Sequence, residues 1–161
     1  MALLQLNTLS GEEAELQLYS CFAHRQWAAR VAAGRPYADW SALMAAAEAA
    51  WSELGRSDWL QAFAAHPRIG ERGGHSPATS QREQSKVMRA GSETLASIAG
   101  ESRRYENRFG HVFLFAASGR SAEEVLQSLR QRMKNDPATE LSVAAAEQRK
   151  ITRLRLEQLL K

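Results

Sequence analysis

The sequence predicts an all-α protein, a single-domain helical bundle of about seven to nine helices. Glycine and proline are sparse, with 10 and 4 among 161 residues, whereas good helix formers such as Ala, Leu, Glu, Gln and Arg are abundant. Apolar residues recur at spacings of three and four, the period of a helix with one buried face. The chain length favours one domain with one hydrophobic core.

Two helices are predicted in the first third of the chain. Ser10 followed by Glu13 is a capping-box pattern, so a helix should begin there and run to Gly34. Asp39 can cap the next helix, and Gly55 should end it as a C′ glycine. The predicted buried face of the first helix consists of Leu16, Tyr19, Ala23, Trp27 and Val31.

A short helix and a polar loop follow. Asp58 can cap the helix, which should end at His66 because Pro67 disfavours the helical conformation in the residue before it. The segment RIGERGGHSPATS, residues 68–80, has only Ile69 as a large apolar residue. It is therefore predicted to be an exposed or site-forming loop.

The next stretch, from Ser80 to Phe109, is predicted to be helical, with a break near Gly91 or Gly100. The apolar run HVFLFAASG, residues 111–119, fits a strand and a buried irregular segment equally well. The predicted buried face of the long stretch consists of Val87, Met88, Gly91, Leu95 and Ile98.

Two helices should complete the chain. Ser121 with Glu124 forms another capping box, which predicts a helix that begins there. The run Asn135-Asp136-Pro137 should end it, and Pro137 suits the first turn of a last helix that continues to the C-terminus.

The bulk composition excludes several classes of protein. A single cysteine, Cys21, excludes an internal disulfide and a cysteine-based metal site. No apolar run approaches the ~20 residues of a membrane helix, and the start of the chain lacks the basic region of a signal peptide. These features predict a cytoplasmic protein. The net charge of +3 is small and the arginines are dispersed, which argues against a nucleic-acid-binding face.

Four groups of residues could carry chemistry. His66 lies where a helix stops at a proline, and its ordinary pKa suits proton transfer near neutral pH. Glu83 and Gln84 could bind amide-like groups from the start of a helix. The residues after Gly110 could present backbone groups to a ligand, and Arg155 lies on a partly apolar stripe where it needs an anionic partner.

Each group also has an ordinary structural explanation. His66 could bond the last carbonyls of its helix, Ser80 and Glu83 could form a capping box, residues 111–119 could be a buried connector, and Arg155 could pair with a structural carboxylate. Spacing alone favours that explanation for the first three groups and leaves Arg155 open. The histidines show no metal-ligand spacing, and there is no phosphate loop or nucleophile elbow.

Taken together, these segments resemble one enzyme family, the 2-oxo-4-hydroxy-4-carboxy-5-ureidoimidazoline (OHCU) decarboxylases. The resemblance spans most of the chain, and its joint order and spacing favours the functional interpretation of His66 and Glu83. One difference is HVF after Phe109-Gly110, where other members have FPF. The matching segments are HPRIG at 66–70, SQREQ at 80–84, YENRFGHVFLF at 105–115, GRSAEEVLQSLRQRMKND at 119–136 and RL at 155–156.

The resemblance implies the family's all-α fold, a homodimer and the cofactor-free decarboxylation of OHCU to (S)-allantoin. It implies His66 as the catalytic histidine and Glu83 as its acidic partner, with an anionic ureidoimidazoline as the substrate. Arg155 corresponds to the family's late arginine, with Arg153 close by. The further substrate-binding residues that it implies are Pro67, Ser80, Gln84, Phe113, Leu114, Phe115, Ala116 and Ala117.

Three other hypotheses differ in their consequences. A helical nucleic-acid-binding or regulatory module would bind DNA or RNA in a salt-dependent way, without need of His66 or Glu83. A metal hydrolase that uses His66, His75 and Glu83 would lose activity in a chelator. A helical interaction protein would have no concave polar pocket near His66.

Overall fold

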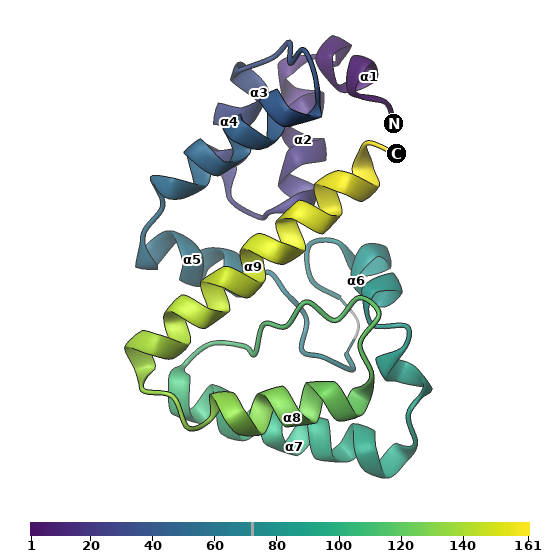
Figure 1. The fold of residues 1–161 in the computed structure, drawn as a ribbon, viewed down its shortest axis with the longest axis vertical. Helices are drawn as coiled ribbons and strands as arrows, with labels where there is room; N and C mark the ends of the chain where they lie inside the picture. Colours follow the sequence, from purple (N-terminus) through teal and green to yellow (C-terminus); the bar gives the residue numbers. More distant parts are fainter. Residues whose placement is uncertain (72) are drawn as a thin grey trace. The chain divides into compact units, whose positions relative to one another are not determined.

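The computed structural model describes residues 1–71 and 73–161, and within them it contains only helices and irregular segments. The all-α prediction is therefore confirmed. Arg72, the residue outside this description, belongs to the loop predicted over residues 68–80. The helices are α1 (Leu3–Thr8), α2 (Gly11–Cys21), α3 (Arg25–Ala33), α4 (Trp40–Ser52), α5 (Arg56–Phe63), α6 (Pro77–Glu83), the 3-10 turn η1 (Val87–Arg89), α7 (Ser92–Phe109), α8 (Ala122–Arg132) and α9 (Pro137–Leu159) (Figure 1).

The chain divides into two compact units, and each is described by itself. The first comprises residues 1–62 and 152–161, and the second comprises residues 63–151. None of the helices in the described part of the chain is long and apolar enough to cross a membrane.

The first unit is built around a core from α1 to α4 and the end of α9. Phe22 and Trp27 meet edge to face at its centre, with ring centroids 5.3 Å apart. The two chain ends lie close together in Figure 1, and the Met1 ammonium donates to the Leu159 carbonyl at 2.7 Å. Packing rather than helix propensity therefore holds the short α1, which the sequence patterns did not predict.

The helix predicted from Ser10 to Gly34 is two helices, so that prediction was wrong in part. Its capping box is present, but α2 ends at Cys21 and α3 begins at Arg25. His24 explains the new start, because its Nδ1 accepts the backbone N–H of Trp27 at 3.2 Å. The buried residues of α2 are Ala14, Leu18 and Cys21, so Leu16 lies off the buried face and is 69% exposed.

Asp39 caps α4 as predicted, by accepting the N–H of Ala42 at 2.8 Å. Gly55 does not end that helix, because α4 stops at Ser52. Asp58 does not cap the next helix either, since α5 begins two residues earlier at Arg56. Asp58 instead sits in the first turn and accepts the N–H of Gly55 at 3.0 Å.

The second unit packs α7 against α8, and these two helices lie side by side in Figure 1. Its core includes Val87, Ile98, Tyr105, Phe113 and Leu129, each at most 3% exposed. The break predicted near Gly91 is confirmed, because α7 begins at Ser92. Met88, which was predicted to be buried, is 46% exposed, and Val87 is the buried residue of η1.

The helix start predicted at Ser80 is wrong. Helix α6 begins at Pro77, so Ser80 lies inside it and Glu83 is its last residue. The physical reason is that Pro77 occupies the first helical position, where its missing N–H costs nothing. Glu83 and Gln84 therefore lie at a helix C-terminus and not in a first turn.

Residues 111–119 form an irregular segment, which decides between the two predicted alternatives. It enters through Gly110, whose φ of 80° makes the left-handed cap that ends α7. It leaves through Ser121, whose capping box with Glu124 starts α8 as predicted. Pro137 is the first residue of α9, also as predicted.

Candidate active site

His66 lies three residues beyond the end of α5, and it is half-buried. Its Nε2 is 2.6 Å from Oε1 of Gln148, a fully buried residue on α9. With the amide oxygen as the acceptor, the imidazole carries its proton on Nε2. The neutral ring then has Nδ1 as its basic nitrogen.

The loop after His66 folds back onto the histidine. His75 lies next to Ala65, the residue before His66, because the backbone N–H of His75 donates to the Ala65 carbonyl at 3.0 Å. The two imidazole rings meet edge to face, with centroids 5.4 Å apart. Gly74 makes this approach possible, since a Cβ there would lie 2.7 Å from both the Ala65 oxygen and the Cδ of Pro67.

Gln84 connects the predicted site segment 80–84 to the segment 66–70. It is buried, and its Oε1 accepts the backbone N–H of Gly70 at 2.7 Å. Residues 66–70 and 80–84, which are separated in the sequence, are therefore brought together as the site prediction requires. The Oε1 atom of Gln84 thus holds the loop, and the ligand-binding role expected of this residue stays a prediction.

Glu83 and Ser80 lie on the same helix, in different environments. Ser80 is 5% exposed inside α6, and Glu83 is half-buried at its end. Pro67 is also half-buried, next to His66. Their contacts with a substrate, and the convergence of Glu83 with His66, remain predictions.

The predicted ligand-binding run from Phe113 to Ala117 is held from two sides. Arg132 of α8 donates through Nη1 to the Leu114 carbonyl at 2.6 Å. Glu147 of α9 accepts the N–H of Ala116 at 3.4 Å. Phe113, Leu114 and Ala117 are buried, whereas Phe115 and Ala116 are half-buried.

A buried charge cluster supports this segment. Glu140 is fully buried, and its Oε1 accepts from Arg132 Nε at 2.7 Å and from the Tyr105 hydroxyl at 2.5 Å. Asn135 donates to the other carboxylate oxygen at 3.0 Å. Burial, and then the bond to Glu140, raise the pKa of Tyr105 well above its usual range, so the phenol stays protonated and donates.

The two late arginines differ in environment. Arg155 is 4% exposed on α9, whereas Arg153 is exposed and pairs with Glu157 at 3.2 Å. The sequence left both arginines as candidates for the family's late arginine, and the difference in burial favours Arg155. This part of α9 belongs to the first unit, and a role for Arg155 toward the substrate remains a prediction.

Sequence analysis missed the side chains of α8 and α9 that hold the site. Gln148, Glu147 and Arg132 each bond a residue at least 18 positions away. A signal was present, because buried polar residues recur along one side of α9 at helical spacing. They are Glu140, Glu147, Gln148, Thr152 and Arg155.

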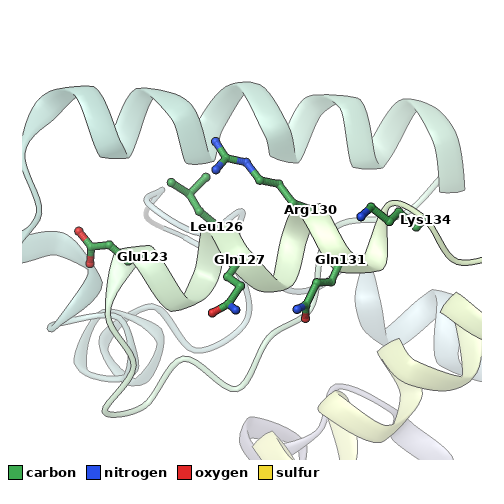
Figure 2. A pocket seen from close by; sticks show the side chains of 6 residues that line it. All are labelled: Glu123, Leu126, Gln127, Arg130, Gln131 and Lys134. Atoms are coloured by element: carbon green, nitrogen blue, oxygen red, sulfur yellow. The ribbon is translucent and has the colours of Figure 1, made fainter.

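Within the described part of the chain, two surface grooves are lined by residues other than the predicted site residues. One of about 310 Å³ follows α8, where Leu126 and Arg130 point toward α7 and Gln127 and Gln131 point to the other side (Figure 2). The other, of about 410 Å³, lies on α2 and α3 beside the exposed Leu16. No predicted site residue lines either groove. Among the described residues, no three potential ligands of the His, Cys, Asp or Glu types are grouped to hold a metal ion.

The family model described as OHCU decarboxylase matches residues 7–157, which is nearly the whole chain. The chain belongs to the OHCU decarboxylase family. A crystal structure of an OHCU decarboxylase in the presence of (S)-allantoin superposes with a TM-score of 0.80 at 31% identity, and covers 90% of this chain and 97% of that one. The family's helical fold is therefore the fold of this protein.

Relatives of this family member occur in two lengths. The 2-oxo-4-hydroxy-4-carboxy-5-ureidoimidazoline decarboxylase of Amia calva is 30% identical, over 99% of this chain and 95% of that protein. The uric acid degradation bifunctional protein TTL of Arabidopsis thaliana is 34% identical over 86% of this chain. The chain spans only 45% of the Arabidopsis protein, which is less than half of its length.

Proposed function

We propose that this member of the OHCU decarboxylase family removes the carboxylate of OHCU as carbon dioxide and yields (S)-allantoin, as a carboxy-lyase of urate breakdown. The observation that carries the proposal is the family match over residues 7–157, which includes both His66 and Glu83. The solved relative at 31% identity, studied with (S)-allantoin, supports the same product.

The chemistry of the substrate explains why the enzyme needs no cofactor. OHCU carries a hydroxyl and a carboxylate on one ring carbon, beside a carbon–nitrogen double bond. When the bond to the carboxylate breaks, its electron pair flows into that double bond, so the substrate acts as its own electron sink. Loss of carbon dioxide leaves an enol, which becomes the product when the hydroxyl loses its proton and the neighbouring ring carbon gains one. The enzyme must therefore position the groups and move protons.

In this proposal His66 is the base. It takes the proton of the substrate hydroxyl as the enol-like intermediate becomes a carbonyl. Glu83 binds the N–H groups of the ureido chain and ring, and Arg155 orients the anionic substrate. Pro67, Ser80, Gln84 and residues 113–117 shape the site. The ties from Gln148, Gln84 and His75 support this assignment, because a catalytic base must be held in one orientation.

The proposal extends to the setting of the reaction. We propose a homodimer in the cytoplasm that acts on a small anionic molecule and on no nucleic acid or membrane. Sedimentation and size-exclusion measurements of the purified chain test the dimer directly.

The decisive experiment generates fresh OHCU from urate in the same cuvette. Circular dichroism then follows the formation of optically active allantoin against the racemic product of spontaneous decay. The enzyme should accelerate formation of one enantiomer, and a chelator should not slow it. Racemic allantoin at the spontaneous rate would reject the proposed function.

A further inference from the structure

Gln148 provides His66 with an unusual partner for a proposed base, namely a neutral amide. The two residues are 82 positions apart, and Nε2 and Oε1 are separated by 2.6 Å. Gln148 is fully buried, so the loss of this bond would leave a polar group without water to replace it. The bond therefore fixes both side chains.

The direction of the bond decides which nitrogen of His66 is basic. An amide oxygen can only accept, so the proton resides on Nε2 and the lone pair on Nδ1. The ring of His75 lies edge-on to the ring of His66, at an interplanar angle of 88°. The imidazole is thus held both in tautomer and in orientation.

Glu147, the residue before Gln148 on α9, is a carboxylate that binds groups other than His66. Glu147 accepts the N–H of Ala116 at 3.4 Å, and its other oxygen pairs with Lys150 at 2.7 Å. The helix consequently turns an amide toward the histidine and a charged group toward the backbone of residues 113–117. A carboxylate in the place of Gln148 would instead stabilise the imidazolium and raise the pKa of His66.

We infer that Gln148 is a positioning residue for the proposed reaction, which holds the proton of His66 on Nε2 so that Nδ1 accepts the proton of the substrate. The inference rests on the proposed function. An amide orients the ring as a carboxylate would, but it places no negative charge beside the imidazole. Among the described titratable and charged groups, His75 of the loop packs on the ring of His66, and Glu147 and Arg149 flank Gln148 on α9.

The test compares Q148E, Q148L and a matched control, Q158E, which makes the same chemical change at an exposed position of α9. A neutral base loses activity as pH falls through its pKa, so kcat/KM has an acid limb centred there. In Q148E the acid limb should move upward by about one pH unit or more. In Q148L kcat should fall by about 10²-fold with KM changed far less. Q158E should match the wild type in both respects.

A second measurement does not depend on activity. The ¹⁵N spectrum of the resting wild-type protein, with the His66 signals assigned through an H66N variant, should show the Nε2–H tautomer. An Nδ1–H tautomer, or an unshifted acid limb in a folded Q148E, would overturn the inference while the proposed function stood. A wild type that makes no (S)-allantoin would reject the function, and the tautomer would still be measured.

Discussion

His66 is held by three kinds of neighbour, and each restricts a different freedom of the side chain. Pro67 limits the backbone beside it, the ring of His75 packs against its edge, and Gln148 sets its tautomer. General acid–base assistance depends on such fixed geometry, because the proton must travel between two defined atoms.

H66A should therefore abolish the proposed catalysis without unfolding the chain, since His66 is only half-buried. We expect kcat for (S)-allantoin formation to fall by about 10²–10⁴-fold, the usual contribution of a general base. E83A should lose a similar factor, and the far-UV circular dichroism of both variants should match the wild type. Normal turnover in a folded H66A protein would refute the assignment of the base.

Gly74 and Gly70 allow a test of the loop that holds the histidine. Both have positive φ, 78° and 92°, so alanine costs each about 1–2 kcal/mol of backbone strain. Only at Gly74 would a Cβ meet other atoms, the Ala65 carbonyl and the ring of Pro67. G74A should therefore displace His66 and lower kcat by about 10²-fold, whereas G70A should not.

Steady-state kinetics of the two variants give the comparison, and thermal melts measure the loss of stability in each. Equal kcat values in G74A and G70A would mean that the close approach at Gly74 does not position His66 for the proposed catalysis.

At the scale of the helix, local patterns predicted some boundaries well and others badly. The capping boxes at Ser10 and Ser121 are present, because there the serine has no competing cap nearby. The same pattern at Ser80 failed, since Pro77 three residues earlier starts α6 first. The break at Phe22 was invisible, because it depends on His24, whose other nitrogen binds Asp58 from α5 at 2.8 Å.

In the candidate site, too, short sequence segments identified some residues, whereas others depend on contacts between distant parts of the chain. The family resemblance placed His66 and the 80–84 segment, and Gln84 brings the two segments together. The resemblance did not predict Gln148 or Arg132, whose partners depend on how α8 and α9 pack. The pattern of a single sequence contains helical periodicity, but it does not contain a contact between two side chains that are 82 positions apart.

Helix α8 is tied to α9 and to the 113–117 run by the buried pair of Arg132 and Glu140. E140Q should be strongly destabilising, because it leaves the Arg132 guanidinium buried without a counter-charge. We expect a loss of about 3–5 kcal/mol in the free energy of unfolding. For a chain of this size, that is a fall in Tm of roughly 10 °C.

Urea titration of E140Q against E123Q measures the effect, since Glu123 is an exposed carboxylate on α8. The control should stay within about 0.5 kcal/mol of the wild type. An E140Q protein as stable as E123Q would show that the buried pair contributes no net stability.

At the scale of the whole molecule, four carboxylates at helix starts respond to acid in the same direction. Each has a lowered pKa. For three of them the main cause of the lowered pKa is a bond from a backbone N–H: Ser10 to Glu13, Gly55 to Asp58 and Thr139 to Asp136. For Glu124 the main cause of the lowered pKa is the bond from the Arg120 guanidinium. These groups belong to α2, α5, α9 and α8, so helix starts in both units are involved.

The sign of the pH dependence follows from linkage. A carboxyl whose pKa is lower in the folded state binds fewer protons there than in the unfolded chain. Its contribution to the free energy of unfolding is fully present above the pKa of the unfolded state and is lost as the pH falls through the pKa of the folded state. The urea midpoint should therefore decline progressively below about pH 5.

The E13Q/E124Q double variant separates this cause from the general repulsion of a basic protein in acid. It should be less stable than the wild type at pH 6, and the difference should shrink as the pH falls and the wild-type carboxyls take up protons. Parallel urea titrations of both proteins from pH 6 to pH 3 make the comparison. A difference that stays constant over that range would show that these helix caps do not set the acid stability of the fold.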